Sequence, residues 1–324
     1  MKAKKLPSGQ WRAQVQKGGV RHSVTRSTKK EAEKAATLLK LSPEDKQIKM
    51  TYGEAIDHYI AKYEKKAFSP STVKMYKDVR RLRFKPLMDM TISKNVDMQA
   101  IIDREDLAPS TLRTSYAVVS ASLKELGLTP PKVRFEKDAP EERPFLDQDQ
   151  IKVFIKAIEG DRYELPYLLC LHSLRCSEML ALKKSQVKDG FIHVSGAMVR
   201  GEGGYVFKKS NKTDASTRMI PILIPRTEEL VAQCPEGTLC PYSYRGMTAH
   251  LQTILRHNDL PVLTLHSLRH SFATLCYSND LATKTIMRLG GWKDYRTLMK
   301  IYTHLAQRQL DEDIIKLRNA LNES

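Results

Sequence analysis

The sequence predicts a multidomain protein: a small β-sheet-plus-helix domain, then a helical bundle, then an α+β domain that is mostly helical with a small antiparallel sheet. Three observations predict this order. Apolar residues alternate with polar ones near the N-terminus, which is typical of half-buried strands. They recur at helical spacing in the middle of the chain, and the last part shows both patterns. Proline-bearing segments without periodicity separate the parts, and we place the domains at 1–45, 50–128 and 142–324.

The N-terminal part is predicted to be a hairpin followed by one helix. Apolar residues alternate in QWRAQVQ and again in VRHSVTR, and KGG supplies a turn between them. Thr28 and Glu31 stand at capping-box spacing in the helical segment STKKEAEKAATLLK. Residues 1–42 hold eleven Lys or Arg against two acids. We therefore expect this sheet to present a basic face to a nucleic-acid groove, with Arg12 and Arg21 as contacts.

The middle part is predicted to be a bundle of helices. Helical spacing of apolar residues runs through TYGEAIDHYIAKY, STVKMYKDVRRLRF and STLRTSYAVVSASLKELG. Pro70 and Pro109 stand near the first turns of the second and third segments, where proline is favoured. The second segment carries a row of cations, which is either an ordinary solvated face or a DNA-contacting face, and the charge of the chain favours DNA. The cations predicted to contact DNA are Lys74, Lys77, Arg80 and Arg81.

The charge of the chain is strongly basic, with a formal net charge of +17 and an isoelectric point near 9.6. Such an excess favours a polyanionic partner, nucleic acid before an anionic membrane, over a merely soluble basic protein. The sequence shows no apolar run long enough to span a bilayer and no apolar signal core at MKAKKLPSGQW. Its five cysteines include no CxxC pair, which predicts a reduced, cytosolic setting.

The pentapeptide LHSLR occurs twice, at 171–175 and 265–269, in otherwise different surroundings. In the second copy, His266, Arg269 and His270 are spaced to share one helical face. A zinc site is disfavoured because a fixed cation lies between the two histidines and no further Cys or carboxylate stands nearby. A guanidinium fork beside an imidazole instead suits a phosphate. His270 can equally be a buried structural histidine.

A second arginine and two more polar residues complete a candidate phosphodiester site. Arg175, from the first LHSLR, would cover the other edge of a phosphate as negative charge grows on it. Lys212 lies in a polar turn between expected strands, where its ammonium can reach a leaving group. Tyr302, near the start of the last helix, carries a hydroxyl with an ordinary pKa of about 10. An arginine-rich pocket would let that hydroxyl act as a nucleophile near neutral pH.

These residues, in this order, resemble the tyrosine recombinases of the phage-integrase family. Four sequence boxes of that family match in order over most of residues 145–305. The matching residues are Arg175 and Glu178 in LHSLRCSEMLALKKSQV, Lys212 in KTDASTRMIPI, His266 and Arg269 in HSLRHSFAT, and Tyr302 in LGGWKDYRTLMKIYTH. The front of the chain also resembles the family, whose small N-terminal domain binds arm sites and whose helical domain binds core sites.

The chain departs from the family pattern at two positions. Ser173 stands where the family usually has glycine before Leu-Arg, so the turn there is expected to differ slightly. The usual third-box histidine is absent, and Trp292 is the expected replacement, although Lys293 competes because the spacing to the nucleophile is one residue longer than common. Tyr295 is a rival nucleophile by residue type, but MKIYTH matches the box better. His172, which has no counterpart in the matched boxes, is expected to be structural.

The resemblance implies a specific chemistry. Tyr302 attacks the scissile phosphate to form a 3′-phosphotyrosine and a free 5′-hydroxyl, while Arg175 and Arg269 hold the phosphate. Lys212 protonates the leaving oxygen and His266 assists the proton transfer. No metal or nucleotide cofactor is implied, because the covalent bond to the protein conserves the energy needed for resealing.

The resemblance also implies partners. These are double-stranded DNA with core and arm sites, a homotetramer on DNA, an excisionase and a host DNA-bending protein, with no membrane and in the cytoplasm of a bacterial host. Apolar positions after the nucleophile would dock a C-terminal helix on a neighbouring protomer, or form ordinary core in a monomer; they are Leu305, Leu310, Ile314, Leu317 and Leu321. Two other functions stay open: a catalytically idle DNA-binding regulator, and a topoisomerase-like enzyme that nicks and closes DNA.

Overall fold

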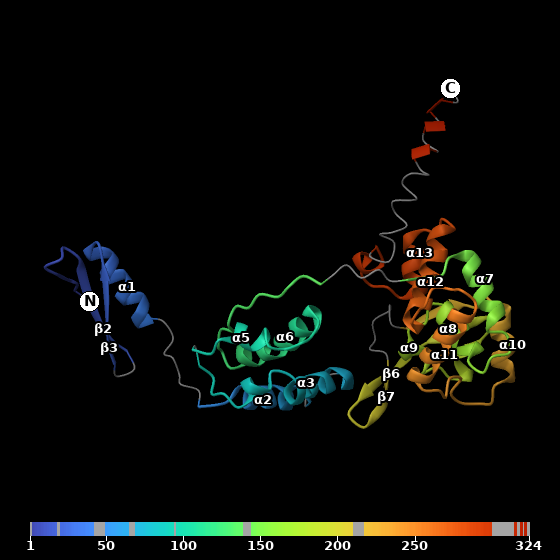
Figure 1. Ribbon diagram of the computed structural model, residues 1–324, viewed down its shortest axis with the longest axis horizontal. Helices are drawn as coiled ribbons and strands as arrows, with labels where there is room; N and C mark the ends of the chain where they lie inside the picture. The colour runs from blue at the N-terminus through green and yellow to red at the C-terminus, as the bar shows by residue number, and fades with distance from the viewer. Residues whose placement is uncertain are drawn as a thin grey trace. The chain divides into compact units, whose positions relative to one another are not determined.

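The computed structural model describes residues 2–17, 20–41, 49–64, 69–93, 95–138, 144–209, 217–299 and, near the C-terminus, 314–315, 318–319 and 321–322 (Figure 1). The chain divides into two compact units. One unit is Met1–Glu54 with Leu87–Val96, and the other is Ala55–Pro86 with Asp97–Ser324. None of the helices in the described ranges is long and apolar enough to cross a membrane.

The first unit contains a three-stranded antiparallel sheet with one helix packed on it. The strands are ordered β1 (Lys4–Lys5), β2 (Trp11–Lys17) and β3 (Val20–Arg26), and the helix is α1 (Lys29–Leu41). Ala13 of β2 is buried together with Ala32 and Ala36 of α1, so small side chains let the helix approach the sheet closely. The predicted helix start is confirmed, because the amide of Glu31 donates to the Thr28 hydroxyl oxygen at 3.3 Å.

The other face of this sheet is polar and basic. The register places Arg12 opposite Thr25 and Gln16 opposite Arg21. Successive side chains of a strand point to opposite faces, and Ala13 is buried beneath α1, so Arg12 and its partners lie on the face away from the helix. Arg12 and Arg21 are both exposed on that face.

The helices of the middle part begin as the prolines predict. They are α2 (Tyr52–Glu64), α3 (Pro70–Leu82), α4 (Lys85–Met88), α5 (Met98–Ile102) and α6 (Pro109–Glu125). Proline opens both α3 and α6, and the Asp97 carboxylate caps α5 by accepting from the amide of Ala100 at 3.1 Å. Side chains that are nearly inaccessible to water include Ile56, Val79, Ile102, Val119 and Leu123.

The segment after α6, predicted to be a linker, is irregular in its described part, 126–138, and is tied to the helices. Arg113 of α6 donates to Asp138 at 2.8 Å, and the amide of Arg134 donates to the Gln99 side chain of α5, also at 2.8 Å. Its first half therefore belongs to the helical part of the second unit.

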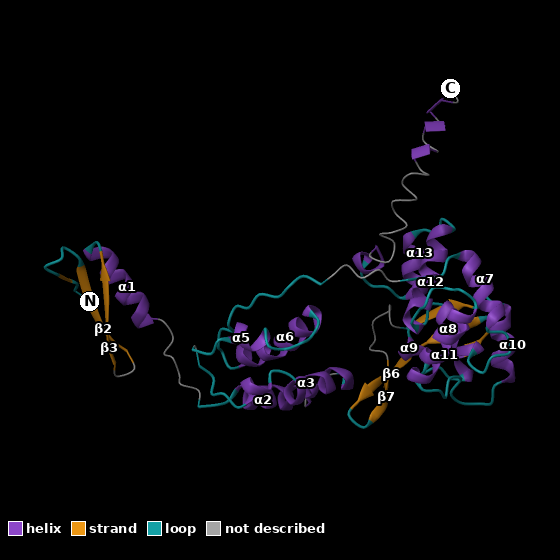
Figure 2. Cartoon of the chain, in the orientation of Figure 1, coloured by secondary structure: helices purple, strands orange, loops and turns teal. Residues whose placement is uncertain are grey.

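The C-terminal part is α+β, as predicted (Figure 2). Its helices are α7 (Gln148–Ala157), α8 (Glu164–Leu171), α9 (Cys176–Met179), α10 (Pro225–Gln233), α11 (Tyr244–His257), α12 (Leu265–Ser278) and α13 (Thr283–Gly290), with a 3-10 turn at Lys184–Gln186. All eight residues of α8 are buried, and α12, with ten buried residues, packs against it. These two helices form the centre of the domain core.

The strands of this part form two separate sheets. They are β4 (Val187–Lys188), β5 (Phe191–Val194), β6 (Gly196–Gly201), β7 (Gly204–Lys209) and β8 (Arg218–Pro221). Among the residues that the structure describes, one sheet has the order β4-β5-β8 and the other consists of β6 paired with β7. The small antiparallel sheet predicted from the sequence is thus divided: β7 pairs with β6, and β5 pairs with β8 across this inserted hairpin.

Candidate active site

The first LHSLR ends α8 and turns the chain towards α9. His172 is the C-cap of α8, and Ser173 adopts a left-handed backbone conformation with φ of 67°. That conformation costs a non-glycine residue on the order of 1 kcal/mol. The Ser173 hydroxyl donates to the carbonyl of Leu289 at 3.2 Å, which offsets a cost of that size. Ser173 therefore occupies a left-handed conformation that favours glycine, and Arg175 follows it as the N-cap of α9.

The second LHSLR opens α12 and meets the first copy. Arg269 is 1% exposed, and its Nη1 donates to the backbone carbonyl of Ser173. Burial and then the positive charge of Arg175 lower the pKa of Arg269 to about 9. The two arginines that were expected to share one phosphate are thus brought together from segments far apart in the chain. Arg175 is more accessible, with a side chain 38% exposed.

Glu178 lies between Arg175 and a residue that the sequence analysis missed, Arg218 of β8. Its carboxylate accepts from the Arg175 amide at 2.8 Å and from Arg175 Nη1 at 2.6 Å. It also accepts from Arg218 Nη1 at 3.0 Å and Nη2 at 2.9 Å. Burial alone would raise the pKa of Glu178, but the hydrogen bonds and charge of Arg218, followed by the charge of Arg175, lower it to about 2.

Sequence alternation could have singled out Arg218. In RMIP of β8, residues 218 and 220 point to the buried face, where apolar side chains are expected. An arginine in that position is desolvated and needs an acidic partner. The strand pattern therefore carried the signal, while the identity of the partner, 40 residues away, did not follow from it.

Trp292 completes the surroundings of Arg269. It follows α13, whose cap residue Gly291 is left-handed with φ of 64°, and it is 8% exposed. The centre of the Arg269 guanidinium lies 4.2 Å from the centre of the Trp292 ring, a cation–π contact. The Gly291 carbonyl accepts from Arg175 Nη2 at 2.7 Å. Of the two competing positions, Trp292 is the one placed against the arginines, and the side chain of Lys293 is exposed.

The histidines take different positions. His266 is exposed on the first turn of α12, and its ring meets that of buried His270 edge-on, with centroids 4.6 Å apart. His172 is fully buried. Its Nε2 accepts from the amides of Leu223 and Ile224 at 2.9 and 3.2 Å, so its Nδ1 carries the proton and donates to the Leu168 carbonyl at 2.8 Å. His172 joins α8 to the segment after β8, the structural role that was expected.

Two of the predicted residues, Lys212 and Tyr302, lie outside the described residues. Tyr295, the rival nucleophile, is 54% exposed. Within the described ranges, no group of three or more His, Cys, Asp or Glu is placed to hold a metal ion. The predicted DNA contacts on α3 are held by carboxylates of the protein itself. These ion pairs are Lys74–Asp78, Lys77–Glu64 at 2.6 Å, Arg80–Asp57 at 3.0 Å and Arg81–Asp78 at 3.2 Å.

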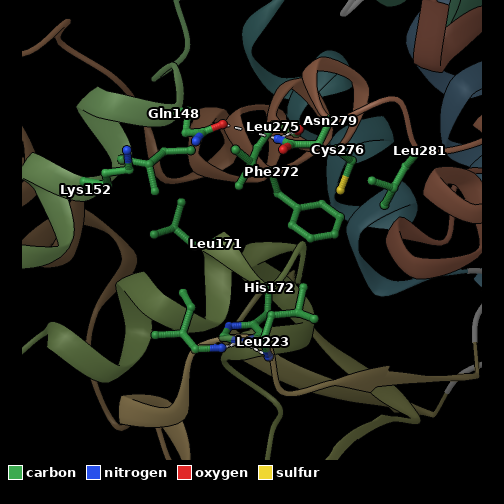
Figure 3. A pocket seen from close by; sticks show the side chains of 12 residues that line it. Gln148, Lys152, Leu171, His172, Leu223, Phe272, Leu275, Cys276, Asn279 and Leu281 are labelled. Carbon is green, nitrogen blue, oxygen red and sulfur yellow. Dashed lines mark hydrogen bonds between the residues drawn. The ribbon is translucent and has the colours of Figure 1, made fainter.

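A pocket of about 430 Å³ lies on another side of the same core, between α7, α8 and α12 (Figure 3). Figure 3 shows the Phe272 ring pointing into it, with His172 and Leu223 on one side and Gln148 and Asn279 on the other. The remaining lining is mainly apolar.

Comparison with known proteins identifies the family of the chain. The Phage integrase family profile matches residues 144–309, just over half of the chain. The chain belongs to the phage integrase family. This part is a tyrosine recombinase catalytic domain, of the enzyme class that breaks and rejoins DNA, and the chain is a tyrosine-type site-specific recombinase.

The relatives of this recombinase are distant. It is 25% identical over 220 residues to the integrase of Escherichia phage P2, a match that covers 65% of this chain and 60% of that protein. It is 26% identical over 296 residues to the tyrosine recombinase XerC of Lactobacillus leichmannii, covering 81% of this chain and 96% of the relative. The chain thus spans less than two thirds of the phage P2 integrase.

Solved structures of the recombinase family share its fold. A Tn1549 transposon integrase in complex with transposon right end DNA superposes with a TM-score of 0.66, at 16% identity, covering 81% of this chain and 99% of that one. A lambda integrase tetramer bound to a Holliday junction superposes with a TM-score of 0.56, at 15% identity, covering 90% and 95% of the two chains. The predicted fold class, a small sheet with a helix, a helical region and an α+β catalytic domain, is confirmed.

Proposed function

We propose that this recombinase integrates and excises a phage or transposon at specific DNA sites through a 3′-phosphotyrosine intermediate. The observation that carries the proposal is the meeting of Arg175 and Arg269 at the Ser173 turn, in a chain of the phage integrase family. Two guanidinium groups from separate segments supply the fixed positive charge that a pentacoordinate phosphorus needs. One of them, Arg269, is preorganised by burial and by Trp292.

In the proposed reaction the Tyr302 hydroxyl oxygen attacks the scissile phosphorus, and the bond from phosphorus to the 5′ oxygen breaks. The leaving oxygen takes a proton from the Lys212 ammonium, while the nucleophile loses its own proton with the help of His266. Arg175 and Arg269 bind the equatorial phosphate oxygens. A 5′-hydroxyl from a partner strand then reverses each step, so no metal or nucleotide cofactor enters.

The proposed DNA contacts follow from the exposed cations. The basic face of the N-terminal sheet, with Arg12 and Arg21, would bind arm sites, since a flat polar strand face fits the major groove. The α3 cations would bind core sites, exchanging their carboxylate partners for phosphates. We propose that residues 1–45 form the arm-site domain, 50–128 the core-site domain and 142–324 the catalytic domain.

We further propose that four protomers assemble on two DNA duplexes. The C-terminal apolar side chains within the described residues are exposed, with Ile314 at 45% and Leu321 at 76%. Leu305, Leu310 and Leu317 lie outside the described residues. The apolar pocket lined by Phe272 offers a neighbouring protomer's C-terminal segment a place to bind. In the cytoplasm of a bacterial host, an excisionase and a host DNA-bending protein would determine whether the reaction proceeds as integration or as excision.

The experiment that tests the reaction uses a nicked core-site substrate, which traps the covalent adduct. Wild type is expected to form the adduct and Tyr302→Phe to form none at the same DNA affinity, with Tyr295→Phe as the matched control that still reacts. An adduct with Tyr302→Phe would contradict the assignment of the nucleophile. Absence of any adduct with wild type would favour an idle regulator, and relaxation of supercoiled plasmid without strand exchange would favour a topoisomerase-like enzyme.

A further inference from the structure

Arg218 is an arginine with a side chain only 5% exposed and with hydrogen bonds in three directions. Its Nη1 and Nη2 donate to the two oxygens of Glu178 at 3.0 and 2.9 Å. Its Nε donates to the carbonyl of Leu289 at 3.1 Å, and Nη2 also reaches the carbonyl of Ser173 at 3.4 Å. A planar five-donor fork is the one side chain that can satisfy such a set of acceptors at once.

Each acceptor of Arg218 belongs to a segment that supports a site arginine. Glu178 binds both the amide and the guanidinium of Arg175. The Ser173 carbonyl also accepts from Arg269. Leu289 lies in the last turn of α13, two residues before Gly291, whose carbonyl accepts from Arg175. Three separate segments that place the two phosphate-binding groups are therefore tied to one side chain of β8.

We propose that Arg218 is a positioning residue for DNA cleavage: it acts through Glu178 and the two carbonyls to hold Arg175 and Arg269 in their reactive positions. This inference rests on the proposed function. Buried ion pairs of this kind add little stability compared with apolar residues of equal volume, so stability alone does not account for the arrangement. Misplacement of a catalytic group by about 1 Å can cost on the order of 10²-fold in rate, which makes such positioning valuable.

The same geometry predicts a pH signature. The charged and titratable groups around Glu178 are Arg175 and Cys176 at its own helix, Arg218 on β8 and Arg269 on α12. With Arg218 present, the pKa of Glu178 is about 2, so the carboxylate stays ionised above pH 5. Without Arg218, burial is opposed by Arg175 and Arg269 with no hydrogen bonds from Arg218, and the pKa of Glu178 rises. A protonated Glu178 holds Arg175 less well, so cleavage by the variant should depend on pH.

The test compares Arg218→Gln with wild type on the nicked core-site substrate at saturating protein. We expect adduct formation to slow by about 10²-fold at pH 6, with unchanged core-site affinity in a gel-shift titration. The loss should shrink as the pH is raised to 8.5. It should not shrink in Arg218→Gln/Glu178→Gln, which lacks the titrating carboxylate. These pH arms separate positioning from a general loss of structure.

A matched control exists in the same domain. Arg226 pairs with buried Glu164 at 2.9 Å, so Arg226→Gln also removes the partner of a buried glutamate, but elsewhere. We expect the Arg226→Gln variant to have a lower melting temperature than wild type, measured by circular dichroism. It should cleave the substrate at the wild-type rate. Should Arg218→Gln not fold, Arg218→Lys replaces it, with cleavage on the order of tenfold slower than wild type at equal affinity.

Three outcomes would overturn the inference. One is a wild-type cleavage rate in the Arg218 variant that is used. Another is a loss of cleavage that is equal at pH 6 and 8.5 and is matched by Arg226→Gln. The third is the absence of adduct with wild type itself, which would remove the proposed function as well. If wild type forms the adduct normally and the Arg218 variant forms it at the same rate, only the positioning role of Arg218 is contradicted.

Discussion

The backbone carbonyl of Ser173 accepts a hydrogen bond from the guanidinium of Arg269, 96 residues further along the chain. Ser173 stands two residues before Arg175, so the turn that directs one arginine also anchors the other. A change in this turn would displace both arginines together. The site therefore responds as one unit, and substitutions near Ser173 should not give additive effects on cleavage.

The contact between Arg269 and Trp292 should depend on Gly290. A Cβ atom added at Gly290 would lie 1.6 Å from the Trp292 ring, so Gly290→Ala must displace the indole from Arg269. We expect a stability loss of about 1–3 kcal/mol and slower adduct formation at unchanged core-site affinity. Chemical denaturation and single-turnover cleavage measure the two effects.

Gly203→Ala is the control for Gly290→Ala, because a Cβ there meets no atom within 4 Å. It should leave both stability and cleavage near the wild-type values. A Gly290→Ala protein with full cleavage activity would show that the stacked position of Trp292 is not needed.

The basic face of the N-terminal sheet should bind arm DNA. Replacing Arg12 and Arg21 together by Ala is expected to weaken arm-site binding by on the order of tenfold or more and to flatten its dependence on salt. Core-site affinity should not change. Gel-shift titrations at several salt concentrations measure both quantities.

Lys30→Ala/Lys34→Ala is the matched control for the sheet variant. It removes the same charge from exposed positions of α1 instead of from the sheet. An equal loss of arm affinity in both double variants would mean that net charge, and not this face, drives binding.

Stability of the catalytic part should fall as His172 is protonated. Burial lowers the pKa of His172, and Nε2 accepts two amide hydrogen bonds that a proton would abolish. A group with a lowered folded pKa contributes its full stability above the unfolded value, about 6.5 for histidine, and loses it as the pH falls below that value. We therefore expect the melting temperature to fall between pH 6.5 and 5 by more in wild type than in His172→Gln.

His257→Gln provides the comparison for His172, since His257 is exposed on α11. Its stability should follow wild type across the same pH range. Parallel curves for wild type and His172→Gln would contradict the buried neutral histidine.

The elements of this fold could be predicted from local pattern, because period and capping are local properties. Pro70 and Pro109 do open helices, and Thr28 does cap one. Strand partners could not be predicted in the same way, since alternation marks a strand without naming its neighbour. The β6–β7 hairpin lies between β5 and β8 in the chain. The sequence RMIP of β8 does not indicate that this strand pairs with Phe191–Val194 of β5.

The site was predictable to the extent that it rests on residue type in ordered boxes. Arg175 and Arg269 were predicted this way, and the fold brings them together. The placement of Trp292, rather than Lys293, against Arg269 could not be predicted from the sequence, because it depends on the left-handed Gly291 that follows α13. Arg218 was missed for a related reason: its importance comes from acceptors on three other segments, and spacing along the chain does not reveal them.

The ion pairs along α3 bear on how tightly the recombinase would hold nonspecific DNA. Each cation that moves to a phosphate leaves a carboxylate behind, and that carboxylate gathers counterions of its own from solution. Release of condensed ions from DNA increases entropy, and uptake of ions by the freed carboxylates of Asp57, Glu64 and Asp78 therefore cancels part of that increase. Binding through α3 would then be less sensitive to salt than the number of its contacts suggests, and random sequence would hold the chain less firmly than its net charge implies.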